Sequence, residues 1–410
     1  MNVAALRLGW RTPLVIVISG CIIAILGFGP RSALGFFLTP LSQANGWGRD
    51  VFGLALAIQN LLWGIAQPFA GAIADRYGTV RVLCVGALLY ALGLALMAYS
   101  QTPAMLHLSA GVLIGFGLSG CSFNIVIAAF GKLVPESWRG LAFGAATAAG
   151  SFGQFLFSPL SVLLQDAYGW QDALIVFAGL TLLVLPFSLA LATPRAGGPS
   201  PAGAAEPQSF RSALGEAILH RSYIYLVLGF FTCGFQLAFI TVHMPAYLTD
   251  RGLSAQVGGW TIAVIGLFNI IGSLGSGWLG NRLPKRYILA IIYFIRAIAV
   301  LAFISFPVTP VSALVFGAVI GLMWLSTVPP TNGLVVVMFG TKWLAMLSGV
   351  VFFSHQVGGF LGVWIGGVAF ERTGSYDVVW WLSILFGVLS ALINLPIVEK
   401  PVARVAAARA

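Results

Sequence analysis

Long apolar stretches and short polar breaks alternate along almost the whole chain, from Pro13 to Ile397. The stretches run to about 20 residues, the length at which a helix crosses the hydrocarbon core of a bilayer. The first stretch is too long for a signal-peptide core and counts as a span. The pattern predicts an all-α membrane protein with twelve transmembrane helices, near 13–41, 50–74, 81–100, 104–132, 140–165, 171–193, 222–247, 254–280, 286–306, 309–339, 343–370 and 377–397.

The spans are expected to form two pseudo-symmetric six-helix bundles, at 1–193 and 222–410, joined by a cytoplasmic linker at 194–221. The linker opens with a Pro/Gly/Ala-rich segment typical of flexible chain, and 210–220 is expected to form a short surface helix. Parallel repeats of this kind are typical of transporters with a substrate site near the midplane, between the halves. Positions that match at an offset of 205 residues are Gly144 and Gly349, Gly153 and Gly358, and Asp172 and Asp377.

Composition and charge support this prediction. Hydrophobic residues make up 59% of the chain and charged residues only 8%, against roughly 25% charged in soluble domains. Sixteen Lys and Arg residues fall on the side of both termini and three, Arg49, Arg251 and Arg372, on the other. This bias predicts a multi-pass protein of the cell inner membrane with both termini cytoplasmic. The net charge of +10 then reflects topology and attraction to membrane lipid. We expect no nucleic-acid partner, and a monomer.

Catalytic and metal-binding signals are missing from the sequence. The four cysteines lie singly within apolar runs, which suits small buried hydrophobes better than a disulfide or metal site. The sequence contains no nucleotide-binding loop, zinc motif or hydrolase triad. We therefore expect neither an enzyme nor a cofactor.

A charged motif, Gly71-x-x-x-Asp75-Arg76-x-Gly78-x-x-Arg81, follows the second span, and a degenerate copy lies at 277–286. Within twelve spans, this motif resembles the major facilitator superfamily over the whole chain. The resemblance implies a cytoplasmic gate in which Asp75 faces a helix N-terminus, where a carboxylate is favoured. Simple topogenic charges are the alternative. The expected gating residues are Gly71, Asp75, Arg76, Gly78, Arg81, Asn281 and Arg282.

A finer resemblance begins in the first span. Phe28-Gly29-Pro30-Arg31-Ser32, followed by Phe36-Phe37, is similar to the monocarboxylate porter and oxalate–formate antiporter branch. That branch places a substrate-related lysine where Arg31 stands. It also carries an Asp and, four residues on, an Arg in the eighth span, where this chain has Asn269 and Ser273. The departure removes the branch's titratable acid and its main carboxylate-binding arginine.

Two arginines, Arg31 and Arg296, lie deep within spans, whereas all eleven acids fall in loops or at span ends. Such an excess of interior positive charge favours an anionic ligand, and the planar guanidinium suits a carboxylate. Arg31 follows Pro30, which frees a backbone carbonyl and bends the helix. We expect Arg31 to contact substrate, with bonding to nearby carbonyls as the alternative. For Arg296 a structural role is at least as fitting.

Histidine is the remaining titratable candidate inside the spans. His355, beside Gln356 and flanked by glycines, is a possible proton site, and His243 is a weaker one for which a structural role fits better. Pro329-Pro330 should break the tenth span, which is tolerated only inside protein or beside water. The expected substrate-binding residues are Arg31, Asn124, Gln154, Gln236, Asn269, Ser273, Asn332, His355 and Gln356.

These patterns indicate a secondary active transporter of small organic anions, monocarboxylate-like, that works by alternating access through symport or antiport. The alternative is an exporter of drugs or other amphipathic compounds. An exporter of cationic drugs is expected to have negative charge, not positive charge, in its interior. The fifth span has Gly150, Gly153 and Pro159 but not the tight Gly-Pro arrangement of drug antiporters.

Overall fold

The computed structural model describes residues 10–193, 210–280, 282–340 and 344–402. A few side chains inside the described helices, among them those of Asp75 and Arg76, are not described. Twelve helices or helix groups are long and apolar enough to cross a membrane. The predicted all-α, twelve-span fold is confirmed.

Several spans are built from more than one helical segment. Short 3-10 segments, η2 (Leu34–Phe37) and η4 (Leu189–Leu191), interrupt the first span and end the sixth, and a π-helix, η3 (His107–Leu113), lies within the fourth. The α-helices are α1 (Pro13–Ala33), α2 (Leu38–Asn45), α3 (Arg49–Tyr77), α4 (Thr79–Ala98), α5 (Pro103–Leu106), α6 (Ile114–Cys121), α7 (Phe123–Leu133), α8 (Glu136–Tyr168), α9 (Trp170–Leu182), α10 (Val184–Ser188), α11 (Phe210–Ile218), α12 (Arg221–Asp250), α13 (Ala255–Gly280), α14 (Lys285–Ser305), α15 (Pro310–Met323), α16 (Val328–Phe339), α17 (Leu344–Thr373) and α18 (Asp377–Asn394).

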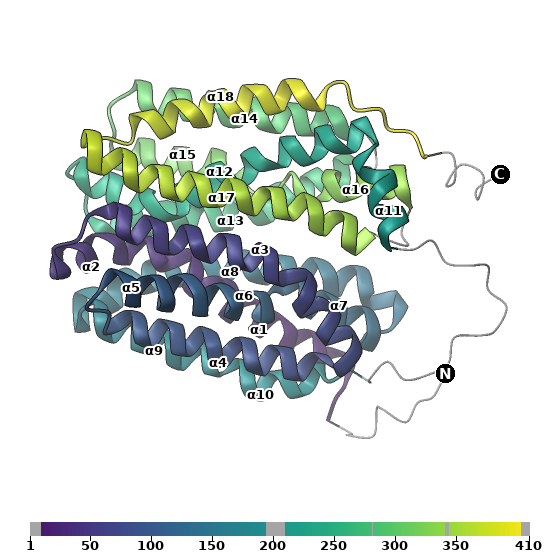
Figure 1. Cartoon of the computed structure of the whole chain (residues 1–410), viewed down its shortest axis with the longest axis horizontal. Helices are drawn as coiled ribbons and strands as arrows, with labels where there is room; N and C mark the ends of the chain where they lie inside the picture. The colour runs from purple at the N-terminus through teal and green to yellow at the C-terminus, as the bar shows by residue number, and fades with distance from the viewer. Residues whose placement is uncertain (1–9, 194–209, 281, 341–343, 403–410) are drawn as a thin grey trace.

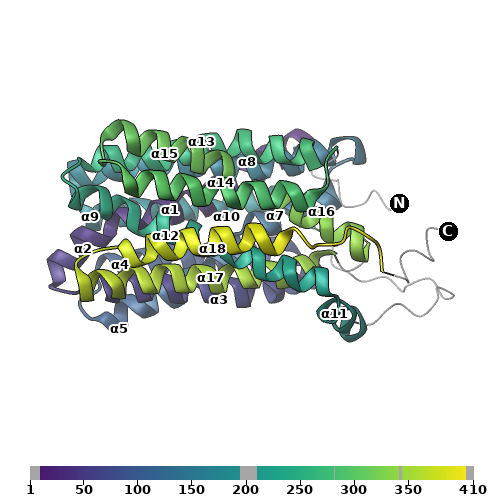
Figure 2. The same cartoon turned by 90° about the horizontal axis from the view of Figure 1, so that it is seen from above.

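The helices lie side by side in two groups (Figure 1). Helices α1–α10 form the lower group in that view and α12–α18 the upper one, and the described chain begins and ends at the same end of the molecule. We call this the terminal end and the opposite one the distal end. The short helix α11, expected at 210–220, lies at the edge of the terminal end (Figure 2) and packs against α12, with Ala217 fully buried. The predicted domain boundaries flank residues 194–209, which lie outside the described part of the chain.

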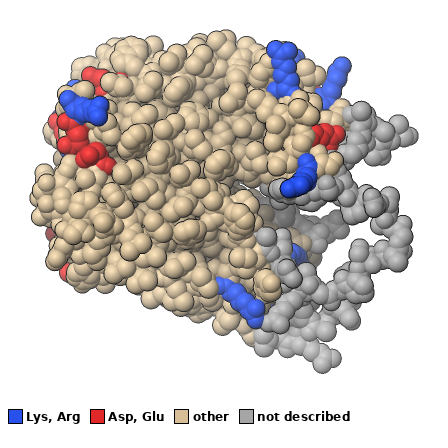
Figure 3. Space-filling view, viewed as in Figure 1, with Lys and Arg blue, Asp and Glu red and all other residues tan. Residues whose placement is uncertain are grey.

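Charged side chains lie at the two ends, and a broad uncharged band lies between them (Figure 3). Large apolar side chains are exposed on this band, for example Leu88 at 52% and Phe294 at 52%. In water such exposure would be unfavourable, but lipid tails match it. The band therefore fits the hydrocarbon core of a bilayer.

Proline accounts for one helix break but not for another. The predicted break of the tenth span is present, because α15 ends at Met323 and α16 begins at Val328, just before Pro329-Pro330. The fourth span also breaks, at the extended residue Ser122. No proline lies there, and the sequence analysis did not predict it. Since 122 and 327 differ by 205, both breaks fall at matching positions of the repeat.

The two halves pack tightly toward the distal end and diverge toward the terminal end. A Cβ at Gly367 of α17 would stand 2.8 Å from Cα of Asp50, and one at Gly35 of η2 would stand 2.4 Å from the Thr241 carbonyl of α12. By contrast, no described atom lies within 4 Å of a Cβ placed at any of four glycines of the two facing helix pairs nearer the terminal end: Gly71, Gly144, Gly275 and Gly349. The halves also stand apart at the right-hand end of Figure 3.

Candidate functional site

Arg31 lies in the last turn of α1, near the middle of the first span, where Pro30 removes a backbone donor. Its Nη2 donates a 2.5 Å hydrogen bond to Oδ1 of Asn60 in α3. The guanidinium carbon lies 4.9 Å from the ring centre of Trp63 and 5.8 Å from that of Phe28. Among the described residues, no carboxylate pairs with this charge. The site thus presents a fixed cation that lacks a counter-ion.

A chain of hydrogen bonds leads from Arg31 into the other half. Asn60, which accepts from Arg31, also accepts at its backbone carbonyl a 3.0 Å hydrogen bond from Nε2 of Gln356 in α17. Oε1 of Gln356 lies 3.0 Å from Nδ1 of His355. Asn60 is 2% exposed and Gln356 is 1% exposed, so both amides are buried in the protein next to the site. The structure therefore brings together three predicted residues, Arg31, His355 and Gln356, through Asn60.

The same chain of hydrogen bonds determines the tautomer of His355. Because the Asn60 carbonyl can only accept, the Gln356 amide nitrogen must face it and Oε1 must face the histidine. Nδ1 of His355 then carries the hydrogen, and Nε2 is the nitrogen that can take up a proton. The ring stacks on Phe352 with centres 5.5 Å apart and lies beside Phe230 and the Cys233 thiol.

Other predicted polar residues make hydrogen bonds within the protein. Gln154 donates to the Ile262 carbonyl, Gln236 donates to the Ser383 carbonyl, and Ser273 donates to carbonyls of its own helix, including that of Asn269. His243 is fully buried, with Nε2 2.8 Å from the Val363 carbonyl. These contacts suit packing between helices. Substrate contact by these residues, and proton binding by His243, stay predictions.

Asn124 and Asn332 differ from these residues. Each is partly exposed and lies just after a helix break, Asn124 in α7 and Asn332 in α16. Neither side chain makes a hydrogen bond within the described part of the chain. Their role in substrate binding stays a prediction.

Arg296 and Asn269 hold the break of the tenth span. Arg296, 1% exposed, donates from Nε to the Met323 carbonyl at 3.1 Å and from Nη2 to the carbonyls of Met323 and Trp324. Oδ1 of Asn269 accepts from the Leu325 N–H at 3.0 Å, while its Nδ2 donates to Ser151 of the other half. The break frees these backbone groups, and the two side chains satisfy them. These contacts suit a structural role for Arg296.

The gate motif lies at the terminal end. Gly78 has φ +94°, which favours glycine, and it ends α3 before α4 begins at Thr79. Arg81 is exposed, and Arg282 lies 4.0 Å from the ring centre of Trp278. The side chains of Asp75 and Arg76, and Asn281 as a whole, lie outside the described part of the chain. The gating role therefore stays a prediction.

A contact at the distal end, which the sequence analysis did not predict, joins the two halves. Arg49, at the start of α3, donates to both carboxylate oxygens of Asp250, at 2.5 and 2.7 Å, and to the Tyr376 hydroxyl at 3.0 Å. Its backbone N–H donates to Glu371 at 2.6 Å, and its guanidinium lies 3.8 Å from the Phe370 ring centre. Burial raises the pKa of Tyr376 to about 12, so the hydroxyl stays neutral. We call Arg49, Asp250, Glu371 and Tyr376 the distal latch.

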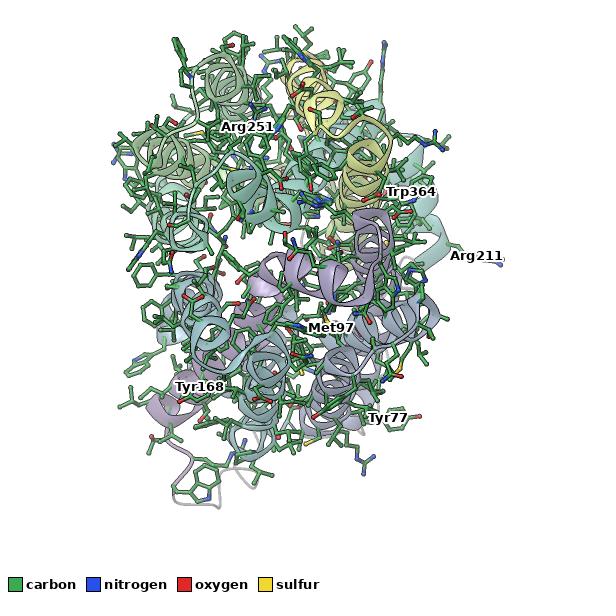
Figure 4. The ribbon with its side chains drawn as sticks, turned by 90° about the vertical axis from the view of Figure 1, so that its left-hand side faces the viewer. Tyr77, Met97, Tyr168, Arg211, Arg251 and Trp364 are labelled. Carbon is green, nitrogen blue, oxygen red and sulfur yellow. The ribbon has the colours of Figure 1, made fainter. Side chains whose placement is uncertain are left out.

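Figure 4 looks at the distal end, with Arg251 in the upper group and Tyr77 and Tyr168 in the lower one. A second polar contact crosses between the groups there, because Gln256 of α13 donates to Asp166 of α8 at 3.0 Å. The distal latch and this contact close the same end.

Comparison with known sequences identifies the family. The sequence model of the Major Facilitator Superfamily matches residues 20–363. The chain belongs to the major facilitator superfamily. It is thus a multi-pass membrane transporter rather than an enzyme. Like its relatives in this superfamily, it acts on a small molecule.

Relatives of this superfamily member span nearly its whole length. It is 29% identical to the uncharacterized MFS-type transporter YcxA of Bacillus subtilis, over 91% of this chain and 92% of that one. It is 26% identical to human monocarboxylate transporter 11, over 87% and 77%. These matches confirm the resemblance to monocarboxylate transporters.

Solved structures share the fold of this superfamily member. A bacterial homologue of the lysosomal transporter Spinster, in an inward-facing and unoccupied conformation, superposes with a TM-score of 0.71 at 16% identity, over 93% of this chain and 96% of that one. The D-xylose–proton symporter superposes with a TM-score of 0.68 at 15% identity, over 95% and 98%.

Proposed function

We propose that this transporter moves small organic anions of the monocarboxylate class by alternating access. Arg31 supports the proposal most directly, because it is a cation at mid-span with no carboxylate partner among the described residues and with Nη2 held by Asn60. Its Nη1 makes no hydrogen bond within the described part of the chain. A buried charge without a partner is costly, and a substrate carboxylate supplies that partner.

We propose that the protein lies in the inner membrane of the cell and that both of its termini are in the cytoplasm. The excess of Lys and Arg at the terminal end supports this orientation. The closed distal end then faces outward and the diverging halves face the cytoplasm. In this state Arg31 is accessible to an anion from the inside.

The proton site we propose is His355. No carboxylate lies within a span interior, and Arg31 is permanently charged. His355 reaches Arg31 through Gln356 and Asn60, so the protonation of His355 and the anion at Arg31 act on one hydrogen-bond chain. The superfamily fold and the distant monocarboxylate transporters support the transport class and leave the substrate itself as a proposal.

A stabilisation assay tests the anion proposal. The purified protein is heated in detergent with monocarboxylates, dicarboxylates, their uncharged amides and an amphipathic cation. We expect carboxylates to raise the melting temperature, since a ligand that binds only the folded state stabilises it. Stabilisation by the amides or by the cation alone would contradict the proposal.

A further inference from the structure

The wall between Arg31 and His355 is aromatic and comes from both halves. Trp63 of α3 faces the Arg31 guanidinium and meets Phe352 of α17 edge to face, with ring centres 5.6 Å apart and an interplanar angle of 74°. Phe352 in turn stacks on His355 at an angle of 11°. Phe28 lies on the Arg31 guanidinium as well. Three carbon-rich rings therefore line the space next to the charge.

These rings are held in place. The indole nitrogen of Trp63 donates a 3.0 Å hydrogen bond to Gln67 one turn along the same helix, and Trp63 is 5% exposed. The nearby amides of Asn60 and Gln356 are buried and already bonded to protein. A ligand whose carboxylate reaches Arg31 thus meets ring carbon, and not hydrogen-bond donors, with the rest of its body.

The permanent charge available at this depth is a single unit. Arg296, the other arginine inside a span, is 1% exposed and directs its N–H groups at the carbonyls of Met323 and Trp324. It is committed to the helix break and cannot pair with a ligand. A second carboxylate on the ligand would have no permanent cation to meet among the described residues of the site, and an unpaired buried charge is strongly unfavourable.

We infer that the site selects monocarboxylates with an aromatic or similarly bulky apolar body over short aliphatic monocarboxylates and over dicarboxylates. The inference rests on the proposed anion function and adds the shape and charge of the substrate. A flat ring that packs against Trp63 or Phe352 can adopt the edge-to-face or offset geometry that aromatic pairs favour. Acetate would bind Arg31 but leave the ring surface uncovered.

Titration calorimetry on the purified full-length protein tests this selectivity with benzoate, acetate and terephthalate. We expect benzoate to bind at least about tenfold more tightly than acetate, because a buried ring adds apolar contact area. Terephthalate should bind more weakly than benzoate. In Trp63→Leu and Phe352→Leu, the ratio of benzoate affinity to acetate affinity should fall toward one, because benzoate alone uses the ring surface. Trp63→Phe, which keeps a ring, should retain the preference.

Trp260→Leu is the matched control, because Trp260 is 50% exposed on α13. It should leave both affinities unchanged, and the melting temperature of each variant checks that it is folded. Acetate or terephthalate binding as tightly as benzoate would overturn the inference, as would equal loss of acetate and benzoate in folded Trp63→Leu. Failure of every anion to bind, or normal benzoate binding by Arg31→Ala, would instead overturn the proposed function and the inference with it.

Discussion

The binding role proposed for Arg31 rests on its surroundings. Pro30 and the 3-10 segment that follows carry the helix past mid-span, Asn60 holds one nitrogen, and Trp63 and Phe28 flank the charge. The guanidinium is thus positioned before any ligand arrives. Such preorganisation reduces the ordering cost of binding.

Removing this charge should abolish high-affinity binding. Deleting one partner of a desolvated charged hydrogen bond costs roughly 2 to 5 kcal/mol, or about thirtyfold to several-thousandfold in affinity. We expect Arg31→Ala to lose benzoate affinity within this range and Arg31→Lys to lose less, because lysine keeps the charge but not the planar fork. Calorimetry measures both affinities. The exposed Arg282→Ala is the control, and unchanged affinity in Arg31→Ala would contradict the assignment.

His355 should couple uptake to a proton gradient. We expect His355→Gln to lose concentrative uptake driven by an inward pH gradient and to keep part of its substrate exchange, because Gln cannot take up a proton. Proteoliposomes loaded with substrate report both activities. The buried His243→Gln is the comparison and should keep gradient-driven uptake. If the gradient drives wild type and His355→Gln equally, His355 is structural.

Candidate functional residues could be identified from the sequence where their side chains are of a kind that is rare inside a membrane span. An arginine or histidine in an apolar span stands out, and so Arg31, His355 and Arg296 were candidates. Asn60 was not among the candidates, although other amides within spans were, and its Nδ2 donates to the Leu56 carbonyl of its own helix. Its contact with Gln356 depends on how the two halves meet, which hydropathy does not encode.

At the scale of the element, the tenth span depends on Arg296 for its break. We expect Arg296→Met to lower the melting temperature in detergent by several degrees, because the buried Met323 carbonyl loses its guanidinium donors, at roughly 1 to 3 kcal/mol, and the Trp324 carbonyl keeps only the weak Cys233 thiol donor. Arg282→Met, at an exposed arginine, should change it little. Equal melting temperatures in Arg296→Met and wild type would show that the break does not need the guanidinium.

The helix breaks differ in how far the sequence predicts them. Two consecutive prolines remove backbone donors and predict the break after Met323 directly. The break at Ser122 has no proline, and the weak helix formers around it, such as Gly120 and Asn124, do not by themselves end a helix. Close packing of Gly27 in α1 against the Cys121 carbonyl accompanies it, and such tertiary contacts override local propensity.

The whole molecule has one end closed by the distal latch. Its ion pair is partly exposed, with side chains at 12% and 32%, so we assign it about 1 kcal/mol, or roughly fivefold in a two-state equilibrium. Arg49→Ala should therefore open the distal end more often. Spin labels are attached to cysteines placed at Trp138 and Arg282, on opposite halves at the terminal end, in a cysteine-free background. Because alternating access closes the terminal end when the distal end opens, a larger fraction of label pairs should then lie at a shorter distance.

Arg251→Ala is the matched control for this change. Arg251 lies at the same end and packs on Tyr247 of its own helix, 5.2 Å from the ring centre. It should leave the distance distribution as in wild type. A distribution in Arg49→Ala that equals that of the control would show that the latch does not hold the distal end closed.

Span number and the repeat were predictable at the scale of the molecule, because hydropathy and the 205-residue offset are written along the chain. Which end is closed was not. It depends on contacts such as Arg49 with Asp250, whose residues were interpreted from the sequence only as loop charges. Two conformations of one sequence share the same hydropathy, so the sequence pattern alone does not distinguish them.

We propose above that Arg31 binds the organic anion that this protein carries across the membrane. Counterflow measures this directly: proteoliposomes loaded with unlabelled benzoate take up labelled benzoate from outside through wild type, Arg31→Ala or Arg282→Ala. We predict strong counterflow in wild type and Arg282→Ala, and in Arg31→Ala an uptake near that of liposomes without protein. Equal counterflow in wild type and correctly folded Arg31→Ala would contradict it.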